Sequence, residues 1–302
     1  MSVIKTLPNK SVNCVITSPP YWQLRDYGWN GQWGLEPTFK MYLENLWSLM
    51  DEIYRVLSDD GTAWINLGDT YNGVKKGNTS NKGYCENTVI DTFAKPKQDK
   101  IEDKCLLLIP HRFAIGCIDR GWIMRNDVVW AKRNAMPESA TDRFSKKHEY
   151  FFFMAKNQDY YFDLENIRIK SLPLNRWGGN KLVAKGVSEW DEGTGQTSYR
   201  DRDMQPNNGM KNPGDISDFW DIPTRASKDK HYAQYNTQLI DRCIVAGCPI
   251  GGVILDPFCG TATTGCRAID LDRKFIGIEG NEEYVKIGNK KLLPFQISQK
   301  LF

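Results

Sequence analysis

Hydrophobic residues recur at helical spacing over one long segment in the first quarter of the chain. They are Phe39, Leu43, Leu46, Trp47, Met50, Ile53, Tyr54 and Leu57. Because residues three and four apart share one face of a helix, this pattern predicts an amphipathic helix between Pro37-Thr38 and Asp59-Asp60-Gly61. A second helix is predicted over 106–119, where Pro110 falls early enough to be tolerated.

Short apolar runs bounded by polar or turn residues predict the strands of a sheet. They lie at 12–16, 63–67, 122–124, 128–130, 150–154, 251–255 and 275–278. Helices are predicted to follow the last two, beginning near Thr264 and at Glu282. With 302 residues, the chain fits one large α/β domain, or one such domain with a substantial insertion.

Two segments lack sustained periodicity. Residues 72–104 are polar and rich in Lys, Asn and Gly. A loop of this length is usually functional or disordered, and the sequence leaves open whether it is a mobile flap or simple disorder. Residues 166–230 contain many Gly, Asn and Asp with scattered tryptophans, and their basic residues are nearly balanced by acidic ones.

Composition changes this picture little. The chain is 40% hydrophobic, 25% charged and carries a net charge of +3, which permits nucleic-acid binding without arguing for it. Its eight cysteines show no CxxC or zinc-like spacing, so we predict reduced thiols and no metal site. No apolar run approaches bilayer length and the first ten residues do not resemble a signal peptide, which predicts a cytoplasmic protein without membrane contact.

The hexapeptide Thr17-Ser18-Pro19-Pro20-Tyr21-Trp22 follows the first predicted strand. Two prolines fix φ at consecutive residues and remove two N–H donors, which makes a rigid turn with outward carbonyls. The Ser18 hydroxyl and the Tyr21 ring would suit a planar group that carries an exocyclic amine. A strand-ending turn with a packed Tyr–Trp pair is the alternative that the hexapeptide alone leaves open.

A turn rich in glycine and threonine, running from Asp256 to Gly265, separates a predicted strand from a predicted helix. Its glycines let a ligand approach the backbone, and the helix start offers free N–H groups. Glu279, which ends the next predicted strand, is placed to accept from both ribose hydroxyls of an adenosine. Asp256 would repel pyrophosphate and attract a cation, so S-adenosylmethionine, with its sulfonium and ammonium groups, fits this turn.

Together the two motifs resemble those of the beta-class amino-methyltransferases of DNA, with (D/N/S)-P-P-(Y/F/W) near the N-terminus and D-P-F-x-G near the C-terminus. The resemblance extends through 130–139, 142–144, 148–150 and 231–236. Asn236 stands where the family usually has proline, which puts cofactor contacts there in doubt. The resemblance implies an α/β, Rossmann-like S-adenosylmethionine-dependent methyltransferase fold. It is circularly permuted, and its mixed sheet has an antiparallel hairpin edge.

The resemblance also implies a division of the chain. Residues 1–165 would form the catalytic half, with a flexible loop at 72–104, residues 166–230 the target-recognition region, and residues 231–302 the cofactor-binding half. DNA is the implied partner. A cognate restriction endonuclease and a second copy of the chain in a homodimer are further possible partners. The sequence does not decide whether the enzyme has these partners or works alone.

Site residues follow from the same resemblance. The implied catalytic residues are Ser18, Pro19, Pro20 and Tyr21. The implied cofactor-binding residues are Thr17, Gln234, Tyr235, Asp256, Pro257, Phe258, Gly260, Thr261, Glu279 and Asn281, the last with helix capping as an alternative. The implied DNA contacts are Trp22, Lys132 and Arg143. Core packing is the alternative for Trp22, and surface salt bridges are the alternative for Lys132 and Arg143.

The implied reaction is direct methyl transfer to the exocyclic amine of a flipped-out base. Serine at position 18 resembles the N4-cytosine branch, whereas Asp or Asn would suggest N6-adenine. We therefore predict a site-specific N4-cytosine DNA methyltransferase, with an N6-adenine enzyme and a catalytically silent DNA-binding protein as alternatives. C5-cytosine methylation is disfavoured because the chain contains no Pro-Cys dipeptide.

Overall fold

The computed structural model describes residues 1–28, 31–73, 98, 100–135, 138, 140–167, 169–170, 210–211, 217–224 and 236–298. Their contacts divide the chain into one unit of Met1–Asp163 with Asp218–Phe302 and a second of Leu164–Ser217. Within the second unit, strands β5 (Ile169–Lys170) and β6 (Met210–Lys211) form an antiparallel pair. The first unit contains the large sheet and the candidate site.

Seven strands form this sheet in the order β7-β3-β4-β2-β1-β8-β9. They are β1 (Val12–Thr17), β2 (Leu57–Leu67), β3 (Ile123–Ala131), β4 (His148–Ala155), β7 (Phe219–Asp221), β8 (Val253–Asp256) and β9 (Lys274–Gly277). Strands β2, β1, β8 and β9 are parallel, whereas β4 is antiparallel to both β2 and β3. This mixed sheet with a β3–β4 hairpin confirms the predicted fold class. Strand β7, which the sequence pattern did not predict, adds to β3 in parallel.

Several helices begin where the local sequence favours a helix start. In α1 (Phe39–Val56) the Thr38 side chain accepts from the backbone N–H of Met41, and α2 (Ile109–Asp119) has a proline in its first turn. Helix α3 (Thr237–Gly247), which was not predicted, begins at Asn236, whose side chain accepts from the N–H of Gln238. Helices α4 (Thr263–Asp270) and α5 (Glu282–Ser298) follow β8 and β9, and the short η1 (Ile4–Thr6) precedes β1.

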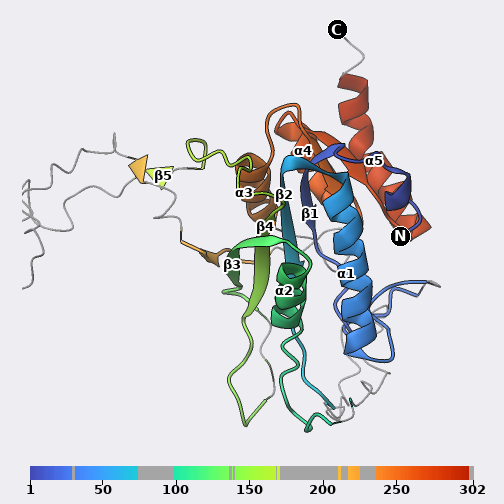
Figure 1. Ribbon diagram of the computed structural model, residues 1–302, viewed down its shortest axis with the longest axis vertical. Helices are drawn as coiled ribbons and strands as arrows, with labels where there is room; N and C mark the ends of the chain where they lie inside the picture. The colour runs from blue at the N-terminus through green and yellow to red at the C-terminus, as the bar shows by residue number, and fades with distance from the viewer. Residues whose placement is uncertain are drawn as a thin grey trace, which may run out of the picture. The chain divides into compact units, whose positions relative to one another are not determined.

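The helices cover both faces of the sheet (Figure 1). Helices α1 and α2 share a core with Ala63, Ile65 and Leu67 of β2. Because side chains alternate along a strand, the intervening residues Thr62 and Trp64 point to the other face, where both lie against Gly247 at the end of α3. Among the described residues, no helix combines the length and apolar character needed to cross a membrane.

Trp64 organises the packing of this second face. Its ring stacks on Phe153 with centroids 4.1 Å apart and planes 2° from parallel, and it also stacks on Trp220 of β7. We expect Trp64→Ala to lower the free energy of unfolding by about 3–5 kcal/mol, because it leaves a cavity between β2, β4 and α3. Urea denaturation would measure the loss. Trp64→Phe should retain part of the stability, and equal stability of Trp64→Ala and the wild type would contradict this packing role.

Candidate active site

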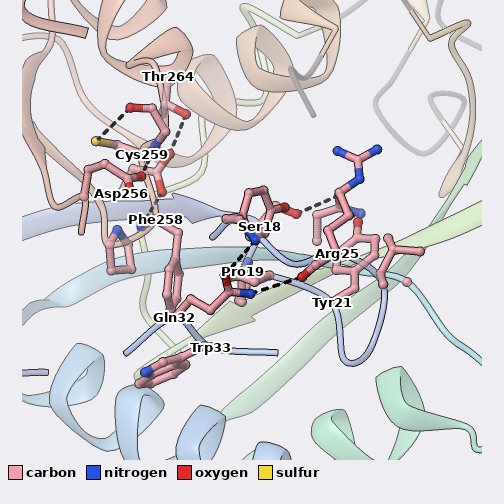
Figure 2. Close-up of a pocket in the computed structure, with 18 of the residues that line it drawn as sticks. Ser18, Pro19, Tyr21, Arg25, Gln32, Trp33, Asp256, Phe258, Cys259 and Thr264 are labelled. Atoms are coloured by element: carbon pink, nitrogen blue, oxygen red, sulfur yellow. Dashed lines mark hydrogen bonds between the residues drawn. The ribbon is translucent and has the colours of Figure 1, made fainter. Parts of the chain in front are cut away.

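A cleft of about 1240 Å³ lies at the carboxyl ends of the parallel strands. Chain reversal after β1, β2, β8 and β9 brings their turns to one edge of the sheet, the usual ligand position in doubly wound folds. Figure 2 shows that the turn after β1, with Ser18 and Tyr21, faces the same space as the turn after β8, with Asp256 and Phe258. The cleft is lined by most of the predicted site residues, namely Ser18, Pro19, Pro20, Tyr21, Lys132, Asp256, Pro257, Phe258, Gly260, Thr261 and Glu279.

Asp256 at the end of β8 is buried, with 1% of its surface exposed. One carboxylate oxygen accepts from the Thr17 hydroxyl at 2.6 Å and from the Phe258 N–H at 3.1 Å, and the other accepts from the Thr264 hydroxyl at 2.7 Å. Burial raises the pKa of Asp256 to about 6, although these hydrogen bonds oppose the shift. The carboxylate therefore joins the tips of β1 and β8 and is charged at neutral pH.

Glu279 shapes the next part of the turn. Its carboxylate accepts from the backbone N–H groups of Gly260 and Asn281, both at 2.8 Å. Gly260 has a φ of +52°, a left-handed conformation that glycine adopts without strain. The Asn281 side chain accepts from the N–H groups of Glu283 and Tyr284 at the start of α5. Asn281 is therefore a helix cap, which is the alternative that the sequence analysis left open.

Aromatic residues wall the part of the cleft beside the turn after β8. The ring of Phe258 contacts that of Trp33 at a centroid distance of 5.3 Å and an angle of 61° (Figure 2). Trp33, Arg25, Tyr27 and Gln32 all line the cleft, and the sequence analysis assigned none of them to the site. They stand in a segment without a motif or periodic pattern, so only its aromatic and polar composition could have drawn attention to it.

A polar network underlies the part of the cleft beside the turn after β1. The Tyr21 hydroxyl lies 2.7 Å from a carboxylate oxygen of Glu149 on β4 and 2.8 Å from the side-chain oxygen of Asn66 on β2, so it can donate its proton to either. Ser18 Oγ lies 3.4 Å from the same oxygen of Asn66. The Tyr42 hydroxyl donates to the Pro20 carbonyl at 2.8 Å and anchors the turn to α1. Asn66 and Glu149 are site residues that the sequence analysis did not select.

The two basic residues among the predicted DNA contacts are engaged within the protein. Lys132 forms an ion pair with Glu149, and its ammonium lies 4.4 Å from the centre of the Trp130 ring. Arg143 donates to Glu138 and stacks on Tyr71 at 4.1 Å. The structure thus shows the salt-bridge alternative for both cations, which leaves a DNA contact by either one a prediction.

The prediction of a DNA contact by Trp22 is wrong. Only 2% of Trp22 is exposed, its indole N–H donates to the Glu36 carbonyl at 2.9 Å, and its ring packs on Phe39. Trp22 belongs to the core, which was the alternative given for it in the sequence analysis. The predicted cofactor contacts Gln234 and Tyr235 lie outside the described residues, as do 74–97 and 99 of the predicted flexible loop.

Gly68, just after β2, leaves room for the Tyr21 ring. A Cβ atom at this position would lie 2.5 Å from Tyr21 Cε2, closer than van der Waals contact allows. Given the catalytic role that the resemblance implies for Tyr21, we expect Gly68→Ala to displace the ring and lower the rate of the reaction by about tenfold, because misplaced catalytic groups lose rate steeply. Cofactor affinity, measured by calorimetry, should not change. A variant with a normal rate would show that the position of the Tyr21 ring does not matter.

The fold and the cleft define a class of protein. A seven-stranded mixed sheet with a Ser-Pro-Pro-Tyr turn after β1 and an Asp-Pro-Phe turn after β8 has the architecture of an S-adenosylmethionine-dependent methyltransferase. The chain matches the N6/N4 family of DNA methylases over residues 12–290. It therefore belongs to this family of DNA methyltransferases, which use S-adenosylmethionine.

Related proteins agree with this assignment. The chain is 36% identical to the type II methyltransferase M.Cfr9I of Citrobacter freundii, over 97% of this chain and 85% of the relative. It is 32% identical to the type II methyltransferase M.SmaI of Serratia marcescens, over 96% of this chain and 87% of the relative. It is also 25% identical to the DNA adenine methyltransferase YhdJ of Escherichia coli K12, over 97% and 80%.

Solved structures share the fold. The cytosine-N4-specific PvuII DNA methyltransferase superposes with a TM-score of 0.61 and 16% identity, covering 95% of this chain and 82% of that one. A putative DNA modification methylase of Thermus thermophilus in complex with S-adenosyl-L-methionine superposes with a TM-score of 0.56 and 19% identity, covering 97% of this chain and 90% of that one. At these identities the likeness establishes the architecture alone.

Proposed function

We propose that this protein transfers the methyl group of S-adenosylmethionine to the exocyclic N4 amine of a cytosine that is flipped out of duplex DNA. The observation that carries the proposal is Ser18, a hydroxyl at the tip of β1 that lines the cleft between Tyr21 and the cofactor turn. Resemblance within the family associates serine at this position with cytosine. The cytosine-N4-specific enzyme among the fold's structural neighbours is a further support.

In this proposal the residues after β1 bind and aim the target amine. An exocyclic amine is a poor nucleophile because its lone pair is delocalised into the ring. Hydrogen bonds donated by the amine to Ser18 Oγ and the Pro19 carbonyl would localise that lone pair, and stacking on Tyr21 would hold the ring. The Tyr21 hydroxyl can donate to Glu149 or to Asn66, and this hydrogen bond orients its ring.

The residues after β8 and β9 would hold the cofactor, which supplies an electrophilic methyl group when bound. The charge of Asp256 suits the cationic methionine end, and the buried Thr17 and Thr264 hydroxyls fix this carboxylate in place. Phe258 and Trp33 offer apolar faces to an adenine, and Glu279 offers carboxylate oxygens to ribose hydroxyls. An acidic, aromatic-walled cleft fits S-adenosylmethionine better than a phosphorylated nucleotide.

The biological setting follows from the named relatives. M.Cfr9I and M.SmaI are type II methyltransferases, so we propose that this chain modifies DNA within a restriction-modification system and protects it from a cognate endonuclease. Residues 166–230 are our proposal for the region that reads the recognition sequence, with 1–165 and 231–302 as the catalytic and cofactor-binding halves. A homodimer remains a prediction that sedimentation would test.

Nucleoside mass spectrometry tests the proposal. Unmethylated DNA is incubated with the purified protein and S-adenosylmethionine, digested to nucleosides and compared with a reaction lacking protein. N4-methylcytosine is the expected product. N6-methyladenine would favour the second candidate, which the similarity to an adenine methyltransferase supports, and would overturn the inference from Ser18.

A further inference from the structure

The loop between β3 and β4 carries a large aromatic side chain that is left in solvent. Phe144 is 97% exposed, more than any other large hydrophobic residue in the described part of the chain. A single exposed apolar residue is ordinary on a protein surface. What distinguishes Phe144 is how the backbone around it is held and what lies beside it.

The chain on both sides of Phe144 is braced by Glu138. One oxygen of this carboxylate accepts from the Arg143 guanidinium at 2.5 Å, and the other accepts from the Lys146 N–H at 3.2 Å. Arg143 also donates to the Phe144 carbonyl at 3.1 Å and stacks on Tyr71. A further ion pair joins Asp142 to Lys104 at 2.6 Å. The protein therefore holds the backbone in place and presents the ring outward.

Phe144 lies two residues along the chain from Lys146, which lines the active-site cleft. The Lys146 ammonium lies 3.5 Å from Asp69 at the end of β2. Two residues of extended chain span about 7 Å at most, so the Cα of Phe144 is within that distance of the Cα of a cleft residue. Figure 1 shows the β3–β4 connection projecting past the end of the sheet, beside the chain that joins β2 to α2.

The surrounding charge suits a polyanion. Residues 132–147 contain five basic and two acidic side chains. Lys132, Arg133, Arg143 and Lys146 pair with carboxylates, whereas Lys147 is exposed. An exposed cation such as Lys147 can neutralise a phosphate beside a point of insertion. An aromatic ring without a nearby cation would fit a protein partner equally well, whereas an aromatic ring next to one matches the alternation of stacked bases and phosphates in DNA.

We infer that Phe144 is a wedge that enters the base stack at the position vacated by the flipped target base. The inference rests on the proposed function, because only an enzyme that extrudes a base leaves such a gap. Flipping unstacks the neighbours of the target base. A ring inserted in its place restores part of that stacking and keeps the base from returning. Phe144 is thus a positioning residue that acts on the DNA and does not touch the reacting atoms.

Phe144→Ala tests this role on two duplexes that share the mapped target site, one with a paired target and one with the target opposite a mismatch. On the paired duplex, kcat/KM should fall by about 30-fold, as expected when part of a base-stacking energy is lost. On the mismatched duplex the loss should nearly vanish, because the target base is already unpaired. Phe144→Trp should keep most of the activity, and Ile115→Ala, which truncates a side chain that is 60% exposed on α2, should behave as wild type on both.

The outcomes separate the wedge from the proposed function. Wild-type methylation of the paired duplex, measured in the same assay, reports on the function, whereas the ratio of variant to wild type reports on the wedge. Equal activity of Phe144→Ala and wild type would overturn the inference. An equal loss on both duplexes would overturn it too, since a general effect on binding or folding does not depend on whether the target is paired.

Discussion

Replacing Ser18 with alanine is expected to lower kcat for methyl transfer by about a hundredfold or more, the scale of effect of a group that handles a proton of the reacting atom. The change removes the hydroxyl that would accept from the target amine, while the prolines after it keep the turn rigid. Because Asp256 and Phe258 lie on the other turn, the dissociation constant for S-adenosylmethionine should stay near the wild-type value.

Two measurements check this expectation. Single-turnover incorporation of a labelled methyl group gives the chemical step, and calorimetry gives cofactor affinity. Ser48→Ala provides a matched control, because this exposed hydroxyl on α1 bonds only to its own helix among the contacts described. Normal turnover by Ser18→Ala would show that Ser18 takes no part in the reaction. The Pro19 carbonyl would then be the candidate acceptor of the hydrogen bond from the target amine.

Replacing Asp256 with asparagine should have the second large effect, this time on cofactor binding. Asparagine keeps the size of the side chain and removes its charge, so the loss reports on attraction between the carboxylate and a cationic ligand. A buried interaction with a charged group contributes about 1.5–3 kcal/mol, which corresponds to a loss of affinity of about 10- to 150-fold at neutral pH. Calorimetric titration with S-adenosylmethionine measures it.

The raised pKa of Asp256 predicts how this affinity depends on pH. Below about pH 6 the carboxyl is protonated and neutral, so wild-type affinity should weaken as pH falls through this value and level off above it. Asp256→Asn should show no such dependence in this range. A wild-type affinity that stays constant across the pKa of Asp256 would show that the carboxylate does not attract the cofactor.

Stability without cofactor should change in the opposite direction. The folded-state pKa of Asp256 lies above its unfolded value of 3.8, so the folded state binds the proton more tightly. Proton linkage therefore stabilises the protein below about pH 4. This contribution of Asp256 to the free energy of unfolding, up to about 3 kcal/mol, is lost as pH rises through about 6. Thermal unfolding of the wild type and Asp256→Asn across this pH range would isolate this contribution. The buried charge of Asp256 thus lowers stability at neutral pH, and in the proposed function this charge serves to bind the cofactor.

Local pattern predicted the elements that carry the two motifs. Helix α1 followed from its apolar face, and the turns after β1 and β8 followed from proline and glycine next to apolar strands. Helix α3 was missed although its cap and apolar face are local signals, whereas β7 has only three residues and too short a pattern to detect. Trp22 was misassigned because its burial depends on Phe39 of α1, which packs on its ring from outside the motif.

The sequence by itself determined the two turns that face the cleft, because each depends on residues that are adjacent in the chain. These two motifs carried the resemblance to the family, and that resemblance implied the mixed α/β fold. Only the tertiary structure decided which distant side chains complete the site. Thr17 reaches Asp256 across 239 residues, and Tyr21 reaches Glu149 across 128. The physical reason is that these contacts depend on the order of the strands and on the antiparallel direction of β4 in the sheet. Neither feature leaves a periodic signal along the chain.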